Sequence, residues 1–94
     1  MSKLSKNNLA AYLKTKREAA GISQKEVSLK LGYSTAQFIS NWERGVSSPP
    51  LDALKKLSTM YKVDAEEIFN ILLDESLKTL ELDMRRKFFG SKAR

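Results

Sequence analysis

SQKEVSLKLGYSTAQFISNWERG, residues 23–45, is the stretch of the sequence that decides the fold. Ser23 and Glu26 stand three residues apart at its start. This is the spacing of a capping box, in which a hydroxyl and a carboxylate each accept a hydrogen bond from a free backbone amide. The apolar residues that follow share one helical face, and Gly32 predicts the end of the helix because glycine readily adopts the left-handed conformation found there. The stretch therefore begins with a short helix that has a signal at both ends.

A second short helix is predicted in the same stretch. Ser34 to Gln37 repeats the capping pattern, with Gln as the partner of the hydroxyl, and Gly45 predicts the end of the helix. The turn between the two helices is then short, from Gly32 to Ser34. Two short helices joined by a short glycine-containing turn are typical of a helix-turn-helix arrangement. The apolar side of the second helix consists of Phe38, Ile39 and Trp42.

Three further helices are predicted around this pair, and strand signals are nearly absent. The first covers roughly residues 7–20; the fourth begins at about Pro50, after a loop at residues 46–50; and the fifth begins after Asp64. In each helix one face is formed by residues three and four positions apart. These residues are Leu9, Leu13, Arg17 and Ala20 in the first helix, Leu51, Leu54, Leu57 and Tyr61 in the fourth, and Ile68, Phe69, Leu72 and Leu73 in the fifth. We expect an all-α domain of five helices over residues 7–73.

Residues 74–94 are predicted to form a C-terminal helical extension with a basic tail. No Gly or Pro interrupts residues 51–89, so the fifth helix either continues directly or turns near Asp74. Apolar residues recur along it at helical spacing and predict an added stripe. This stripe either folds back on the core or, as we favour, joins two copies of the chain in a homodimer. It consists of Leu73, Leu77, Leu80, Met84 and Phe88.

The composition argues against enzymatic chemistry. The 94 residues include no Cys and no His, which removes the usual thiolate nucleophile, general base and metal ligand. Asp64, Glu66 and Glu67 are acidic neighbours that could suggest a metal, but helix capping explains them better. We therefore predict no catalytic residue, no metal and no cofactor. The N-terminal part has no apolar run long enough for a signal peptide or a membrane span, so a cytoplasmic protein is expected.

The charge is unevenly distributed along the chain. The net charge is +6, and residues 64–83 hold seven Asp/Glu against one Lys. Residues 84–94, in contrast, hold five Lys/Arg and no acid, and residues 1–63 are also basic on balance. A basic body favours phosphate-bearing partners through counterion release and electrostatic steering. Because many proteins are modestly basic, the charge alone does not decide the partner.

Residues 21–34 and 39–45 together resemble the Xre family, the helix-turn-helix family of phage repressors and Cro proteins. The resemblance covers about residues 9–70, because it continues through residues of the last two helices at the spacing of the family. It implies a lambda-repressor-like fold and a DNA-binding transcriptional regulator, expected to be a bacterial or phage repressor. The helix at residues 35–44 would then lie in the major groove of double-stranded DNA. The matching positions are Pro49, Leu51, Leu54, Leu57, Tyr61, Val63, Asp64, Glu67, Ile68 and Phe69.

One departure from the family pattern affects the choice of base-reading residues. Four residues, instead of the usual three, separate Ser34 from Ile39, so either the turn is longer or the helix starts earlier. With Ile39 and Trp42 facing inward, the outward side chains can donate to and accept from base edges. Gln37 could instead serve only the cap, and Asn41 could simply be exposed to solvent. The predicted base-reading residues are Ala36, Gln37, Ser40 and Asn41.

Phosphate contacts are expected around this helix. The family typically grips the DNA backbone with the loop after the recognition helix, which favours two serines there over the lysines of the first helix. The start of the second helix also favours an anion, because its backbone amides point outward. The predicted phosphate-binding residues are Gln24, Thr35, Arg44, Ser47, Ser48 and Lys55.

The resemblance also implies a buried ion pair between Arg17 and Glu43. Arg17 lies on the apolar face of the first helix, where an unpaired charge would be costly. Members of the family pair an arginine at this position with the glutamate before the helix exit. We expect this pair to fix the first helix against the recognition helix.

Two functions of different classes follow. The favoured one is a homodimeric regulator on a palindromic or pseudo-palindromic site, where two recognition helices lie about 34 Å apart, one turn of the duplex. The alternative is an antitoxin or adaptor that acts mainly through protein binding by its acidic and apolar C-terminal region. In the alternative, Gln37 and Asn41 would be dispensable.

Overall fold

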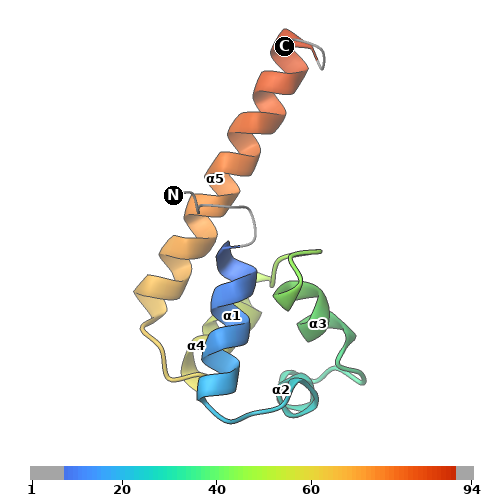
Figure 1. Ribbon diagram of the computed structural model, residues 1–94, viewed down its shortest axis with the longest axis vertical. Helices are drawn as coiled ribbons and strands as arrows, with labels where there is room; N and C mark the ends of the chain where they lie inside the picture. Colours follow the sequence, from blue (N-terminus) through green and yellow to red (C-terminus); the bar gives the residue numbers. More distant parts are fainter. Residues whose placement is uncertain (1–7, 91–94) are drawn as a thin grey trace.

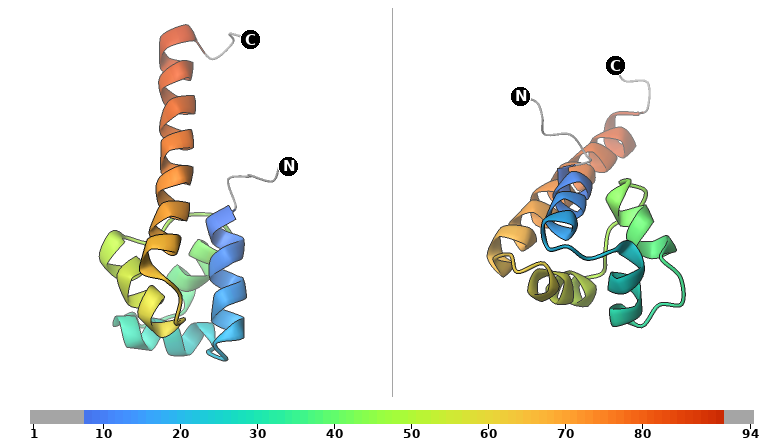
Figure 2. Two further views of the ribbon diagram at one scale, coloured as in Figure 1. Left: turned by 90° about the vertical axis from the view of Figure 1, so that its left-hand side faces the viewer. Right: turned by 60° about the horizontal axis from the view of Figure 1, so that its bottom comes forward.

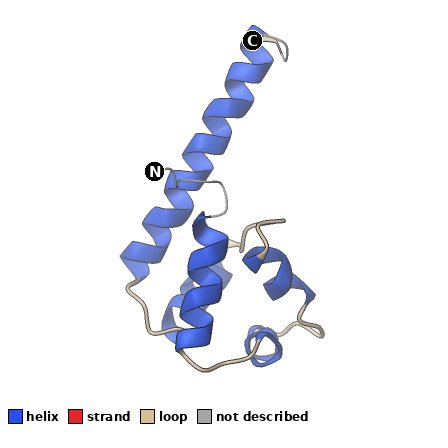
Figure 3. Ribbon diagram, viewed as in Figure 1, coloured by secondary structure: helices blue, strands red, loops and turns tan. Residues whose placement is uncertain are grey.

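The computed structural model describes residues 8–90 and confirms the expected all-α architecture of five helices. No strand occurs in this part of the chain (Figure 3). The first four helices and the base of the fifth form the body, and the rest of the fifth projects from it (Figure 1). Residues 1–7, which include the predicted start of the first helix at residue 7, and residues 91–94, the end of the predicted basic tail, lie outside the described residues. The helices are α1 (Asn8–Ala19), α2 (Gln24–Leu31), α3 (Gln37–Glu43), α4 (Leu51–Met60) and α5 (Ala65–Phe89).

Every helix contributes to one apolar core. α1 packs against both α3 and α5, and α4 packs against α2 and α5. α1 thus lies between the helix-turn-helix pair and the base of α5 (Figure 2). Burial of these aliphatic side chains supplies the main favourable free energy of folding. The most deeply buried apolar side chains, at 0–1% exposure, are Leu13, Val27, Ile39, Leu57 and Ile68.

Both ends of α2 have the predicted structure. The Ser23 hydroxyl accepts a hydrogen bond from the Glu26 backbone N–H at 3.0 Å, and the Glu26 carboxylate accepts one from the Ser23 N–H at 2.9 Å. Gly32 closes the helix with φ of 89°, in the left-handed region that side chains disfavour. The capping box and the glycine therefore delimit α2 as expected.

The capping box should make stability depend on pH. The hydrogen bond from the Ser23 backbone, followed by that from its side chain, lowers the pKa of Glu26 below its ordinary value. A lowered folded-state pKa adds stability that is present above the unfolded-state pKa and is lost as pH falls through the folded-state pKa. We expect urea unfolding between about pH 7 and pH 3 to show this loss in the wild type and less of it in Glu26→Gln, which cannot ionise. A Glu26→Gln variant with the full wild-type pH dependence would exclude a role for this carboxylate.

The turn between α2 and α3 is longer than predicted. α2 ends at Leu31 and α3 begins only at Gln37, so the predicted capping box at Ser34 is wrong. Ala36 stands at the N-cap without a side-chain hydrogen bond, while the Thr35 hydroxyl accepts a bond from the Gln37 N–H at 3.2 Å. Ile39 is buried, and this burial fixes the rotational phase of α3. The extra residue before Ile39 is therefore accommodated in the turn, and the helix covers residues 37–43 rather than 35–44.

Some predicted inner positions are exposed. Leu51 begins α4 and is exposed, whereas the other predicted positions of its stripe are buried, so its assignment to the core is wrong. Phe69 and Leu73 are also exposed, because the core-facing side of α5 passes through Ile68. Asp64 is the N-cap of α5 as predicted, but its side chain makes no capping hydrogen bond. The apolar stripes therefore predicted which side of each helix faces the core, but they did not predict which residues at the edge of that side are buried.

α5 continues without a break past Asp74. It has 25 residues, so the C-terminal extension is a continuation of α5 and not a separate helix. Glu75 lies near its middle and accepts a hydrogen bond from the Leu9 N–H at 2.7 Å. This contact pairs a free amide at the start of α1, whose own first turn has no acidic residue. No local sequence pattern predicts this hydrogen bond, because the two residues are 66 positions apart.

Candidate nucleic-acid interface

α3 lies at the edge of the body, on the other side of α1 from α5 (Figures 1 and 2). Ile39 and Trp42 face inward, with 1% and 3% exposure, and anchor the helix in the core. Gln37 and Arg44 are exposed, and Asn41 is partly exposed. α3 therefore presents a polar outer side on a helix held firmly from within.

The polar side chains of this outer side are joined in a chain of hydrogen bonds. The Asn41 Oδ1 accepts bonds from Gln37 Nε2 at 2.9 Å and from Arg44 Nη2 at 2.7 Å. The Arg44 Nε also donates to the Ser40 hydroxyl at 3.2 Å. Because a carbonyl oxygen has two lone pairs, the two bonds satisfy Oδ1, and the two N–H donors of Asn41 stay available. The arrangement orients the amide of Asn41 before any ligand is bound.

The four predicted base-reading residues lie within α3 or at its N-cap. Ala36 is the N-cap and is partly exposed, and Gln37 begins the helix. Arg44, predicted to contact phosphate, bonds two of the base-reading candidates in the free chain, Ser40 and Asn41. Its positions three and four residues after them are the helical signal that could have predicted this.

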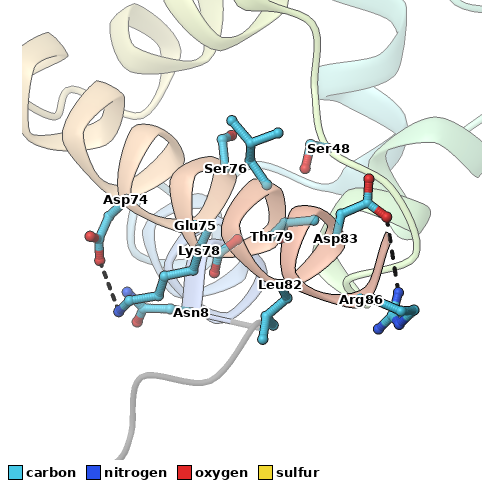
Figure 4. A pocket seen from close by; sticks show the side chains of 11 residues that line it. Asn8, Ser48, Asp74, Glu75, Ser76, Lys78, Thr79, Leu82, Asp83 and Arg86 are labelled. Atoms are coloured by element: carbon cyan, nitrogen blue, oxygen red, sulfur yellow. Dashed lines mark hydrogen bonds and ion pairs between the residues drawn. The ribbon is translucent and has the colours of Figure 1, made fainter. Parts of the chain in front are cut away.

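The predicted phosphate-binding residues occupy different environments. Ser47 and Lys55 are exposed. Ser48, also exposed, lines a groove beside the projecting part of α5, where Figure 4 shows it across from Ser76 and Asp83. The Thr35 hydroxyl is already bonded within the turn. The candidates therefore do not form one cluster.

Arg17 and Glu43, the predicted ion pair, are in direct contact. Arg17 Nε donates to Glu43 Oε2 at 2.7 Å and Arg17 Nη2 donates to Glu43 Oε1 at 3.1 Å, a two-bond geometry. The remaining Nη1 donates to the Ile22 carbonyl at 2.8 Å. The hydrogen bond to Glu43 is the main cause that raises the pKa of Arg17, so the guanidinium stays charged. The pair ties the end of α1 to the end of α3.

Gln24 completes this contact and was not predicted to do so. Its Nε2 donates to Glu43 Oε1 at 2.9 Å, so one carboxylate accepts hydrogen bonds from α1 and α2. Gln24 was predicted to bind phosphate, and in this structure its side-chain amide is committed to the protein. Tyr61 is buried nearby, and its burial, together with the charge of Glu43, raises the pKa of its hydroxyl. Glu43, the last residue of α3, therefore links α1 and α2 to α3.

The lengthened turn at residues 32–36 is held by buried and aromatic contacts. The Ser28 hydroxyl donates to the Thr35 carbonyl at 2.5 Å. The Tyr33 ring lies 4.7 Å from the Phe38 ring and 6.1 Å from the Trp42 ring, measured between centroids. Phe38 is half exposed and covers the side of the turn, as the sequence suggested. These contacts give the longer turn a defined conformation.

Two further features concern residues 8–90 as a whole. No group of three or more acidic side chains in this range is placed to hold a metal ion. No helix within it is both long enough and apolar enough to span a membrane.

The part of the chain that matches a known family lies within the body, which is formed by α1 to α4 and the base of α5. The family model described as helix-turn-helix matches residues 13–68, from α1 to the first turn of α5. The HTH-type transcriptional regulator ImmR of Bacillus subtilis (strain 168) is 36% identical over 80 residues, which cover 85% of this chain. The aligned part covers 61% of that relative, so the chain spans less than two thirds of its length. No solved structure matches the chain significantly. The projecting part of α5 lies outside the family match.

Proposed function

Because the chain belongs to the helix-turn-helix family, in line with the Xre-like resemblance of its sequence, we propose that it is a sequence-specific DNA-binding transcriptional regulator that acts as a repressor in the cytoplasm. The observation that carries the proposal is the outer side of α3, where polar groups at helical spacing surround an oriented amide. In helix-turn-helix proteins the second helix of the pair lies in the major groove. The relative ImmR is named as a transcriptional regulator, which supports the same function here.

The proposed base readers are suited to particular bases. Amides such as those of Gln37 and Asn41 pair with adenine through one donor and one acceptor, whereas a guanidinium pairs with guanine. In the free chain the acceptor oxygen of Asn41 is bonded to Gln37 and Arg44, so Asn41 offers only its donors to a base until one of these bonds is exchanged for a bond to adenine. Ala36 and Ser40 present a methyl group and a hydroxyl, which suit the thymine methyl group or a neighbouring phosphate.

Phosphate contacts are proposed on both sides of α3. Thr35 precedes the helix, Ser47 and Ser48 follow it, and Lys55 lies exposed on α4. Gln24 contributes through the first backbone amides of α2, since its side chain is bonded to Glu43. These contacts fix the register of the protein on the duplex and carry no sequence information themselves.

A homodimer through the C-terminal part of α5 completes the proposal. One recognition helix reads only a few base pairs, and two-fold pairing doubles the site. All five residues of the predicted stripe are exposed in the single chain, between 41% and 81%. The alternative, an antitoxin or adaptor, would use the same side of α5 for another polypeptide. Double-stranded DNA and a second copy of the chain are therefore the proposed partners.

Selection from a random duplex library tests this function. We expect enrichment of one motif with two-fold symmetry, and affinity for it that falls steeply with salt, by about 10³-fold between about 50 and 200 mM if about six phosphates are contacted. Lys55→Ala should weaken binding to all duplexes alike and lower the salt slope by about one per bound copy. No enriched motif, or an affinity independent of salt, would exclude DNA as the main partner. If DNA is excluded in this way and a second polypeptide binds through α5, the antitoxin or adaptor function is favoured.

A further inference from the structure

The projecting part of α5 has two different sides. Its body side passes through Ile68, which is buried, and Glu75, which bonds α1. Successive helical residues are rotated by about 100°, so Leu77 points almost opposite to Glu75. The apolar stripe therefore faces mainly away from the body, and Leu80, at the edge of the stripe, also lines the groove that Ser48 lines. Its members are Leu73, Leu77, Leu80, Met84 and Phe88.

The spacing of the stripe is nearly the same when α5 is read in either direction. Leu73 and Phe88 lie equally far from the point between residues 80 and 81, and so do Leu77 and Met84. If a second α5 runs in the opposite direction across this point, each of these pairs comes into contact. Leu80 then lies beside its own copy at the centre.

One edge of the stripe carries alternating charges, which we call the charge ladder: Asp74, Lys78, Glu81 and Arg85. Within the chain, Lys78 Nζ lies 3.4 Å from Asp74 Oδ2 (Figure 4), and Arg85 Nε lies 3.0 Å from Glu81 Oε2. The order of charge is minus, plus, minus, plus, which reverses when the helix runs the other way. In an antiparallel pair equal edges face each other, so each charge faces its opposite on the second copy. Asp74 would face Arg85, and Lys78 would face Glu81.

A parallel pair would not match opposite charges along the charge ladder in this way. In that arrangement the charge ladder of one copy faces the other edge of the stripe, which carries Asp83 and Lys87. Glu81 would then lie near Asp83, and Arg85 would lie between Asp83 and Lys87. Like charges in these flanking positions disfavour a pairing, and opposite charges set the orientation of two helices.

We propose that two copies of the chain pair through the projecting part of α5 in antiparallel orientation, with the two-fold axis beside Leu80. This inference rests on the homodimer of the proposed function and adds its orientation. About twelve residues of α5 separate Ile68 from the axis, so the two cores lie roughly 36 Å apart along the helices. This spacing is close to the roughly 34 Å between major-groove faces one turn apart.

Disulfide cross-linking tests the orientation, because the chain contains no cysteine of its own. A disulfide needs Cβ atoms about 4 Å apart. In the antiparallel pair, Leu77→Cys faces Met84 and not itself, so neither Leu77→Cys alone nor Met84→Cys alone should cross-link. A mixture of the two variants should give at least about tenfold more covalent dimer under mild oxidation. Leu82→Cys, exposed on the opposite side of α5, is the matched control and should remain uncross-linked.

A variant with the charge ladder inverted gives an independent measurement. In Asp74→Lys/Lys78→Glu/Glu81→Lys/Arg85→Glu, every attraction within and between antiparallel copies is restored. Mixed with the wild type, it should form the two homodimers, with mixed dimers at least about fivefold below the statistical share in native mass spectrometry. A parallel pair would instead give mixed dimers at about the statistical share, because each ladder would then face Asp83 and Lys87, which the variant leaves unchanged.

The outcomes separate the two proposals. Efficient cross-linking of Leu77→Cys with itself, or mixed dimers at the statistical share, would overturn the antiparallel orientation and leave DNA binding and dimerisation intact. A monomer at all concentrations in sedimentation, with sequence-specific DNA binding retained, would overturn the pairing alone. Antiparallel cross-links without DNA binding would leave the pairing and exclude the proposed function.

Discussion

Replacing Glu43 by leucine is expected to lower the free energy of unfolding by about 3–5 kcal/mol. The substitution removes a carboxylate that accepts hydrogen bonds from both Arg17 and Gln24. Arg17 would remain buried with only the Ile22 carbonyl as a strong partner, and an uncompensated buried charge is costly. Since small domains have little stability to lose, this variant should be unfolded to a measurable extent. Urea unfolding followed by circular dichroism measures the change.

Two controls separate the ion pair from simple packing. In Arg17→Met/Glu43→Leu both charges are gone, and we expect most of the lost stability to return, because apolar residues of similar size often replace a buried pair at little cost. Glu18→Ala removes an exposed carboxylate whose closest approach to Arg17 is 4.0 Å, and should change stability by less than about 0.5 kcal/mol. A Glu43→Leu loss as small as that of Glu18→Ala would show that the pair does not stabilise the fold.

The sequence was most informative where local chemistry decides the structure. Ser23, Glu26 and Gly32 define α2 through bonds and dihedral angles within a few residues, so the capping pattern was sufficient. Ile39 and Trp42 were correctly placed inside, because burial follows the helical repeat. The pair of Arg17 and Glu43 came from the resemblance alone, since no local pattern joins residues 26 positions apart.

The features that were missed depend on contacts distant in sequence or on competition between signals. The Ser34 cap would have started α3 earlier, but the Ser28 and Tyr33 contacts hold residues 32–36 as a turn. Gln24 has two possible partners, an anion or Glu43, and only the packing of α2 on α3 selects the second. The sequence did not decide whether α5 continues past Asp74 or turns there, because nothing between residues 51 and 89 distinguishes a continued helix from a sharp bend.

Replacing Gln37 and Asn41 by alanine is expected to remove most of the base preference at the selected site. A bidentate contact to a base contributes about 1–3 kcal/mol of discrimination, so each single variant should lose about 5- to 150-fold in affinity for the preferred duplex. Binding to a scrambled duplex at the same salt concentration should change little, because phosphate contacts carry that affinity. Fluorescence anisotropy with both duplexes gives the ratio. Thr59→Ala, an exposed polar position near the end of α4, is the control.

The hydrogen bonds between these side chains predict that their effects are not additive. Asn41 Oδ1 is the shared acceptor of Gln37 and Arg44, so Asn41→Ala releases both donors at once. Contacting residues typically show coupling of about 0.5–3 kcal/mol, and we expect the double variant to lose less than the sum of the two single losses. Arg44→Ala should reproduce part of the Asn41→Ala loss and also reduce the salt dependence if the guanidinium reaches a phosphate. Alanine favours the helix, so the variants should stay folded. Strict additivity would show that the bonds on the outer side of α3 do not prearrange it for DNA.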